Sequence, residues 1–176
     1  MSGYELSQFF ATSTGWVWTA PHSQIYPTLA KMQAEELVAS ENQIRGTKLV
    51  RKVYSATAKG LQELVEWTGT FHPSSGSREP LLTQALLFDL VEPDQAAKVL
   101  REFIVEQEAI ARESRSHSKH LLNKDTPLLR ERLEHRDPGD HDAIARIKAH
   151  VFEGQAALAE TRVAWAREGL VLLQRS

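Results

Sequence analysis

The 176-residue chain contains no cysteine, which excludes disulfide bonds and any chemistry that depends on a thiolate. It also lacks an apolar run near the roughly 18 residues that a membrane-spanning helix needs. Its first residues show no basic segment followed by an apolar core, so no signal peptide is indicated. These absences favour a cytoplasmic protein that does not enter a membrane.

The chain has no general excess of positive charge, because 21 lysines and arginines are set against 23 aspartates and glutamates, for a net charge of −2. The basic residues are nevertheless unevenly placed. No acidic residue falls between Glu41 and Glu63, an interval that contains Arg45, Lys48, Arg51, Lys52 and Lys59. A local basic patch is the footprint expected for a polyanion, although lysines that blunt an exposed strand edge would give the same pattern.

Signatures of catalysis are absent as well. The sequence has neither a glycine-rich phosphate loop nor a nucleophile elbow. His117 and His120 are close together in one predicted helix, and His135 and His141 flank an aspartate-rich loop, but a metal site needs three or four converging ligands. We therefore expect no enzyme, no cofactor and no metal site; a metal-dependent helical hydrolase is the alternative, which metal analysis would test.

What the sequence does contain begins with a mixed N-terminal region. Helices are predicted over residues 3–11 and 22–36, followed by a β-hairpin over 37–56 that turns at Gly46. Thr57 is a suitable N-cap for a further helix that reaches about Trp67. Helix, helix, hairpin and helix in this order form a small α+β unit.

The remainder of the chain is helical in pattern. Residues 70–80 are rich in glycine, proline and serine and mark a linker. Helices are predicted over 81–88, 93–123 and 141–173, and the last contains large apolar residues partly at helical spacing: Ile144, Ile147, Val151, Leu158, Trp165 and Leu172. Two helices of about 30 residues cannot bury their apolar stripes on each other alone, so we expect pairing within a dimer.

The helix over 22–36 has an unusual outer face. Its apolar stripe is thin, and the opposite side is small, polar and nearly uncharged. Short side chains allow the backbone of a helix to approach base edges in the major groove of DNA. Followed by a basic hairpin, such a helix has the layout of a winged helix-turn-helix. A half-buried helix with no nucleic-acid partner would show the same face, and this alternative remains.

Three segments, SGYELSQFF (2–10), HSQIYPTLAKMQAEELV (22–38) and KVYSATAKG (52–60), resemble the PadR family of winged-helix transcriptional regulators in their order and spacing. LLTQALLFD and AWAREGL, in the helical half, are similar to the C-terminal domain of the longer, AphA-like members. The resemblance implies a mainly helical α+β fold: a winged helix-turn-helix domain over 1–69, a linker over 70–80 and a long-helix dimerisation domain over 81–176.

The same resemblance implies a function. It predicts a transcriptional regulator, typically a repressor, that binds an inverted-repeat operator in double-stranded DNA as a homodimer and often responds to a small ligand. Carried over by position, the DNA-contacting residues are Ser23, Gln24, Tyr26, Pro27 and Lys31 of the recognition helix and Arg45, Lys48 and Arg51 of the wing. Gly3 and Tyr4 belong to the SGY segment that opens the preceding helix.

Two expectations are left with alternatives. The residues Trp16, Trp18, Phe103 and Trp165 pack in a core or interface, or line a pocket for a small aromatic effector. Family members usually have a further helix before SGY, so the first helix is expected to be missing here, with lower stability or an altered dimer as the consequence. A winged-helix module that binds proteins and no DNA is the competing function.

Overall fold

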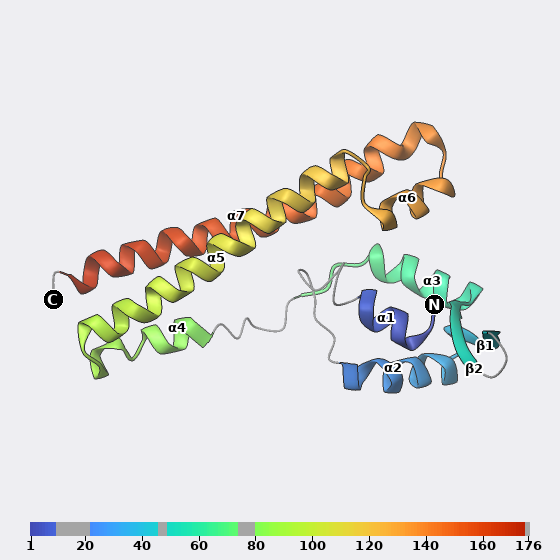
Figure 1. The fold of residues 1–176 in the computed structure, drawn as a ribbon, viewed down its shortest axis with the longest axis horizontal. Coiled ribbons are helices and arrows are strands. Elements are labelled where there is room, and N and C mark those ends of the chain that lie inside the picture. The colour runs from blue at the N-terminus through green and yellow to red at the C-terminus, as the bar shows by residue number, and fades with distance from the viewer. Residues whose placement is uncertain (10–21, 46–48, 74–79, 175–176) are drawn as a thin grey trace. The chain divides into compact units, whose positions relative to one another are not determined.

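The computed structural model describes residues 1–9, 22–45, 49–73 and 80–174 (Figure 1). The chain divides into two compact units, Met1–Ser77 and Arg78–Ser176. Among the described residues, helices predominate and the strands form one two-stranded sheet, which confirms the predicted mainly helical α+β class. No helix in this described part is long and apolar enough to cross a membrane.

The N-terminal unit combines three helices with an antiparallel hairpin. The predicted hairpin is present, and in it Val38 is paired with Ala56 and Arg45 with Leu49. Ser2 forms a β-bridge with Val53, and so the first residues lie along β2. The elements are α1 (Gly3–Phe9), α2 (His22–Ala34), β1 (Val38–Arg45), β2 (Leu49–Ala56) and α3 (Ala58–Thr68).

The first turn of α1 is closed by a capping box. The Ser2 backbone N–H donates to Glu5 Oε2 over 2.9 Å, and the Glu5 N–H donates to Ser2 Oγ over 3.3 Å. Two backbone donors that a helix start would leave unpaired are satisfied in this way. The tetrapeptide that begins the SGY segment is thus a local signal for where α1 starts.

The start of α3 holds the connection between α2 and β1, residues 35–37, which we call the joint between α2 and β1. Helix α2 ends earlier than predicted because Glu36 adopts a positive φ of 60°, and the Leu37 N–H donates back to the Met32 carbonyl over 2.8 Å. Thr57 caps α3, as predicted: its Oγ1 accepts from the Gly60 N–H over 3.0 Å and donates to the Glu36 carbonyl over 2.7 Å. Thr57 therefore connects the start of α3 to the segment between α2 and β1.

The C-terminal unit is built on two long helices that lie side by side and antiparallel (Figure 1). Their bounds agree with the predicted helices. A short helix that the sequence did not predict, α6, buries Leu129 and Leu133 against Leu121 and Phe152 at one end of the pair. The elements are α4 (Pro80–Ala85), η2 (Phe88–Leu90), α5 (Pro93–Leu122), α6 (Pro127–Glu134), η3 (Pro138–Asp140) and α7 (His141–Leu173).

The seam between α5 and α7 is made mostly of small residues. From α7 it buries alanines at spacings of three, four or seven residues, none more than 2% exposed: Ala145, Ala149, Ala156, Ala159 and Ala166. From α5 it includes Ala111, Ser114 and Ser118. Small side chains at these spacings allow two helix backbones to approach closely.

Five large apolar residues of α7 lie outside this seam. Ile147, Val151, Leu158, Trp165 and Leu172 are between 37% and 70% exposed. Since Val151, Leu158, Trp165 and Leu172 recur every seven residues, they fall in one row along the helix. We call these five residues the α7 stripe. The unit alone leaves the stripe exposed to solvent.

Candidate nucleic-acid interface

Helix α2 presents the face that the sequence predicted. Ile25 and Leu29 are each 6% exposed and anchor the helix to the unit. Their neighbours on the outer side are all exposed: Ser23, Gln24, Tyr26, Pro27 and Lys31. The helix contains no acidic residue between His22 and Ala34, and so nothing on it would repel a phosphate backbone.

Lys31 and Glu35 meet at the C-terminal end of this face. Their side chains approach to 3.8 Å and are 75% and 50% exposed, so the ion pair is weak and solvent-screened. A phosphate could compete with Glu35 for the lysine at little cost. Pro27 lies within α2, with its side chain on the exposed side.

Arg51 is turned toward α1. Its guanidinium forms an ion pair with Glu5, and its side chain is only 29% exposed. Arg51 Nε is buried with no hydrogen-bond partner among the described residues. The arginine thus joins β2 to the capping box of α1, so a phosphate contact would require its guanidinium to leave Glu5.

The carboxyl of Glu5 responds to this arrangement. The hydrogen bond from the Ser2 backbone N–H, followed by the hydrogen bond from Arg51, holds the pKa of Glu5 below its ordinary value of 4.5. A lowered native pKa means that the ionised carboxylate stabilises the fold. That stability is present above the unfolded-state pKa and is lost as pH falls through the native pKa.

We therefore expect Glu5→Gln to lower the free energy of unfolding at neutral pH, and the difference from wild type to vanish in the acid range below 4.5. Urea unfolding at a series of pH values measures this difference. Glu63→Gln, on the exposed surface of α3, is the matched control and should leave stability nearly unchanged. If Glu5→Gln lowered the free energy of unfolding by the same amount in acid as at neutral pH, the ionised carboxylate of Glu5 would not be what stabilises the fold.

The remaining wing residues are placed only in part. Arg45 is the last residue of β1, so its backbone lies next to the hairpin tip, whereas Lys48 falls outside the described residues. Sequence reasoning assigned no role to Lys52, which is exposed and donates to Gln33 Oε1 over 3.0 Å while its Nζ lies 5.2 Å from the Tyr54 ring centroid. The sequence could have separated the two residues. Neighbouring residues of a strand face opposite sides of the sheet, so Arg51 and Lys52 cannot both point toward DNA.

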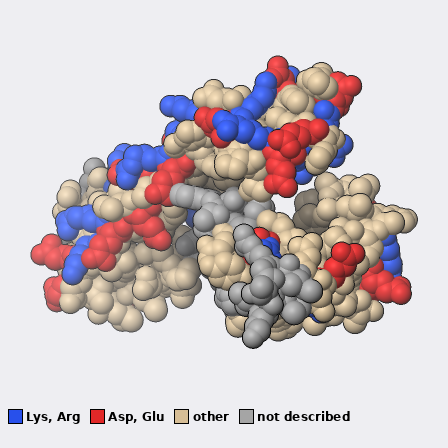
Figure 2. Space-filling view, turned by 45° about the vertical axis from the view of Figure 1, so that its right-hand side comes forward, with Lys and Arg blue, Asp and Glu red and all other residues tan. Residues whose placement is uncertain are grey.

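Charge is mixed on the face shown in Figure 2: basic and acidic side chains are interspersed, and no extended region of one sign is visible in this view. On this face no broad positive surface is present that would attract a polyanion.

The predicted effector residues are only partly described. Trp16 and Trp18 lie outside the described residues. Phe103 and Trp165 pack edge to face, with ring centroids 6.4 Å apart and planes at 89°. This geometry suits core or interface packing as well as the wall of a pocket, so the effector pocket stays a prediction.

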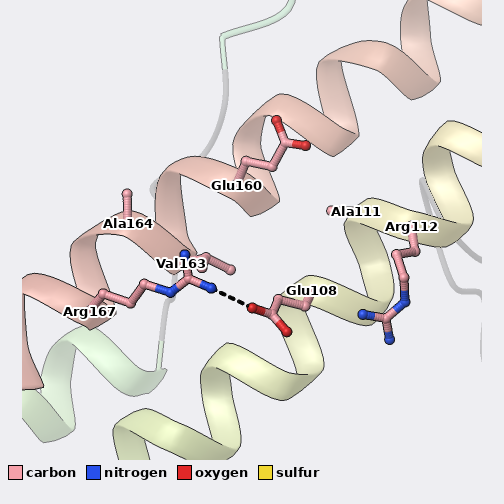
Figure 3. Close-up of a pocket in the computed structure, with 7 residues that line it drawn as sticks. All are labelled: Glu108, Ala111, Arg112, Glu160, Val163, Ala164 and Arg167. Atoms are coloured by element: carbon pink, nitrogen blue, oxygen red, sulfur yellow. Dashed lines mark hydrogen bonds and ion pairs between the residues drawn. The ribbon is translucent and has the colours of Figure 1, made fainter.

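A different hollow is found between α5 and α7 (Figure 3). It has a volume of about 310 Å³, and the Arg167 guanidinium spans it to reach Glu108 over 2.7 Å. Beside it Arg115 holds Glu160 at 2.6–2.8 Å. Its lining is largely charged and includes neither Phe103 nor Trp165: Glu108, Ala111, Arg112, Glu160, Val163, Ala164 and Arg167.

The histidines considered as ligands have other contacts. His117 packs on Phe152, with ring centroids 4.3 Å apart, and burial lowers its pKa. His120 Nδ1 lies 2.9 Å from the carboxylate of Asp125. Within the described ranges no group of three or more histidine, aspartate or glutamate side chains could hold a metal ion.

The exposed face of α2 without acidic residues, the hairpin that follows it and the long helical pair together define a winged helix-turn-helix protein with a helical C-terminal unit. Residues 1–66 match the family model of the transcriptional regulator PadR-like family. The predicted resemblance to the PadR family is thus confirmed.

Curated relatives agree with this assignment. The negative transcriptional regulator PadR of Bacillus subtilis is 27% identical over 129 residues, which is 73% of this chain and 71% of the relative. The probable transcriptional regulator Rv1176c of Mycobacterium tuberculosis is 27% identical over 174 residues, or 98% of this chain and 90% of the relative. The second match spans both units.

Solved structures share the fold at lower identity. B. subtilis PadR in complex with operator DNA superposes with a TM-score of 0.75 at 23% identity, covering 98% of this chain and 90% of that one. The Vibrio cholerae virulence activator AphA gives 0.64 at 20% identity, covering 99% and 90%. B. subtilis PadR in complex with p-coumaric acid gives 0.66 at 20% identity, covering 99% and 88%.

Proposed function

We propose that this protein is a sequence-specific DNA-binding repressor that acts as a homodimer in the cytoplasm and has no enzymatic activity. Residues 1–69 would form its DNA-binding domain, and residues 81–176, joined by the linker 70–80, its dimerisation domain. The observation that carries the proposal is the outer face of α2, on which all five predicted DNA-contacting residues are exposed and none is acidic. The B. subtilis relative is named a negative regulator, and a solved neighbour holds operator DNA.

In this proposal each part of the interface has its own task. Ser23, Gln24 and Tyr26 hydrogen-bond to base edges, with Pro27 in apolar contact, and Lys31 reaches a phosphate. The wing residues Arg45 and Lys48 meet the backbone of the flanking DNA, and Arg51 mainly holds the wing strand to α1 through Glu5. Two such faces in a dimer would read half-sites about one helical turn apart.

Dimerisation follows from the α7 stripe. A soluble unit that leaves a valine, an isoleucine, a tryptophan and two leucines exposed in a row has an apolar face to cover. Heptad spacing is the pattern of helix–helix interfaces. A second copy of the same helix supplies the same spacing, and so a symmetric pair of α7 helices would bury the stripe.

An effector completes the proposal. A solved neighbour, B. subtilis PadR, binds p-coumaric acid, which supports a small aromatic molecule as the ligand here. Such a ligand would release DNA by favouring dimers whose recognition helices are wrongly spaced for the operator. Phe103 and Trp165 are the aromatic residues of the C-terminal unit that we propose for its pocket.

Salt dependence tests the DNA proposal directly. If the dimer neutralises about six to ten phosphates, its affinity should fall about 10³- to 10⁵-fold between roughly 50 and 200 mM salt. Fluorescence anisotropy with the DNA upstream of the protein's own gene measures this, and a scrambled duplex of the same length is the control. A module that binds only proteins would show no salt-dependent binding to either duplex.

A further inference from the structure

The ring of Tyr26 in the recognition helix lies directly on the backbone of α1. Gly3, the first residue of α1, is buried beneath it. A Cβ added to Gly3 would fall 2.6 Å from Tyr26 Cε1, 2.9 Å from Cζ and 3.2 Å from the hydroxyl oxygen. The first two distances are shorter than any real Cβ contact. The ring can therefore occupy its place only because residue 3 has no side chain.

Gly3 itself is held from three sides. The capping box of Ser2 and Glu5 fixes the first turn of α1, and Glu5 is in turn paired with Arg51 of β2. The backbone of Met1 exchanges hydrogen bonds of 2.8 Å with Tyr54, also in β2. The surface under the Tyr26 ring is thus rigidly connected to the wing strand.

We infer that Gly3 is a positioning residue for sequence reading: its bare backbone seats the ring of Tyr26, a residue of the proposed DNA face of α2. The inference rests on the function proposed above. Tyr26 is 49% exposed, so the contact with α1 covers only part of the side chain. A side chain at residue 3 would lift the ring off its seat or push α2 away from α1.

The effect of such a side chain is separable from helix stability. Gly3 has no positive φ, and alanine is a better helix former than glycine. Gly3→Ala should therefore stabilise α1 itself, and it should weaken DNA binding only by displacing the Tyr26 ring. Because an aromatic side chain that is misplaced by about 1 Å loses its hydrogen-bond geometry, recognition should suffer more than folding does.

The experiment compares Gly3→Ala with wild type on two duplexes: one selected by the wild-type protein from a random-sequence library, and its scrambled counterpart. We expect Gly3→Ala to bind the selected duplex about ten- to a hundredfold more weakly, the range of one base contact. Affinity for the scrambled duplex and its salt dependence should not change. Gly69→Ala is the matched control, because its Cβ would meet nothing closer than 3.6 Å.

A double-mutant cycle shows whether the effect passes through the ring. Tyr26→Ala alone should weaken binding to the selected duplex, and Gly3→Ala should cause no further loss in that background. If the losses of affinity caused by Gly3→Ala and Tyr26→Ala were additive, the inference would be overturned. It would also be overturned if Gly3→Ala weakened binding equally on both duplexes, because Gly3 would then serve the fold only. Full affinity of Gly3→Ala would also overturn it and leave the proposed function standing. If the wild-type protein selects no sequence, the proposed function fails and the inference falls with it.

Discussion

Replacement of Leu158 by aspartate is expected to make the protein monomeric and to lower its affinity for specific DNA by about 10²- to 10⁴-fold. Leu158 is 64% exposed at the centre of the α7 stripe, so the isolated unit should tolerate the charge. In a symmetric dimer the same carboxylate would be buried opposite its own copy, where the two like charges repel each other and are costly to desolvate. A monomer holds one half-site and loses the effective concentration that links the two halves.

Sedimentation of Leu158→Asp at several concentrations would give its oligomeric state, and anisotropy on the selected duplex would give the affinity. Ala164→Asp is the matched control, since Ala164 is exposed on α7 beside the charged hollow of Figure 3, away from the stripe. It introduces the same charge and should stay dimeric. A dimer of unchanged affinity for Leu158→Asp would show that the stripe is not the interface.

The N-terminal unit was largely predictable because its signals are local. Thr57 is followed by a helix whose Gly60 N–H it caps, and the hairpin follows from a turn glycine between two short strands. Each of these signals spans only a few residues, so no tertiary information is needed to read it. The exposed face of α2 followed for the same reason, since a helix with two buried residues leaves the others outside.

The C-terminal unit shows where the pattern misleads. Large apolar residues define the predicted stripe of α7, yet alanines fill the seam with α5. Hydrophobicity scales weigh a leucine above an alanine, whereas close packing of two helices selects small residues. Only the packed structure shows which of two apolar faces meets the neighbouring helix. Helix α6 was missed because its eight residues, four of them charged, are too few to show a recognisable helical repeat of apolar residues.

Long-range contacts were beyond the sequence altogether. Arg51 was assigned to DNA by its position in the family pattern, whereas its pairing with Glu5 depends on how α1 lies on the hairpin. The contact of Tyr26 with Gly3 likewise joins two helices separated by residues 10–21. Charge and spacing identify which residue types are available. Which of them stay free for a ligand depends on their neighbours in space.

Gly60→Ala should destabilise the N-terminal unit more than any other single-methyl substitution named here. A Cβ at residue 60 would overlap the carbonyl oxygen of Leu37, which is backbone and cannot rotate away as a side chain can. That oxygen already accepts from the Thr57 N–H over 3.1 Å and from Thr57 Oγ1 over 3.2 Å. To make room, α3 must separate from the joint between α2 and β1, and the cap must break.

The expected cost is about 1–3 kcal/mol for overpacking and about 1 kcal/mol for the lost cap. It exceeds the roughly 1 kcal/mol that alanine contributes over glycine inside a helix. Urea unfolding should show the loss, and binding should weaken on the selected and the scrambled duplex alike, unlike that of Gly3→Ala. Gly69→Ala, at the other end of α3, should remain close to wild type because its Cβ has ordinary contacts. If Gly60→Ala were as stable as the wild type, the close approach of Gly60 in α3 to the Leu37 backbone would not be needed for stability.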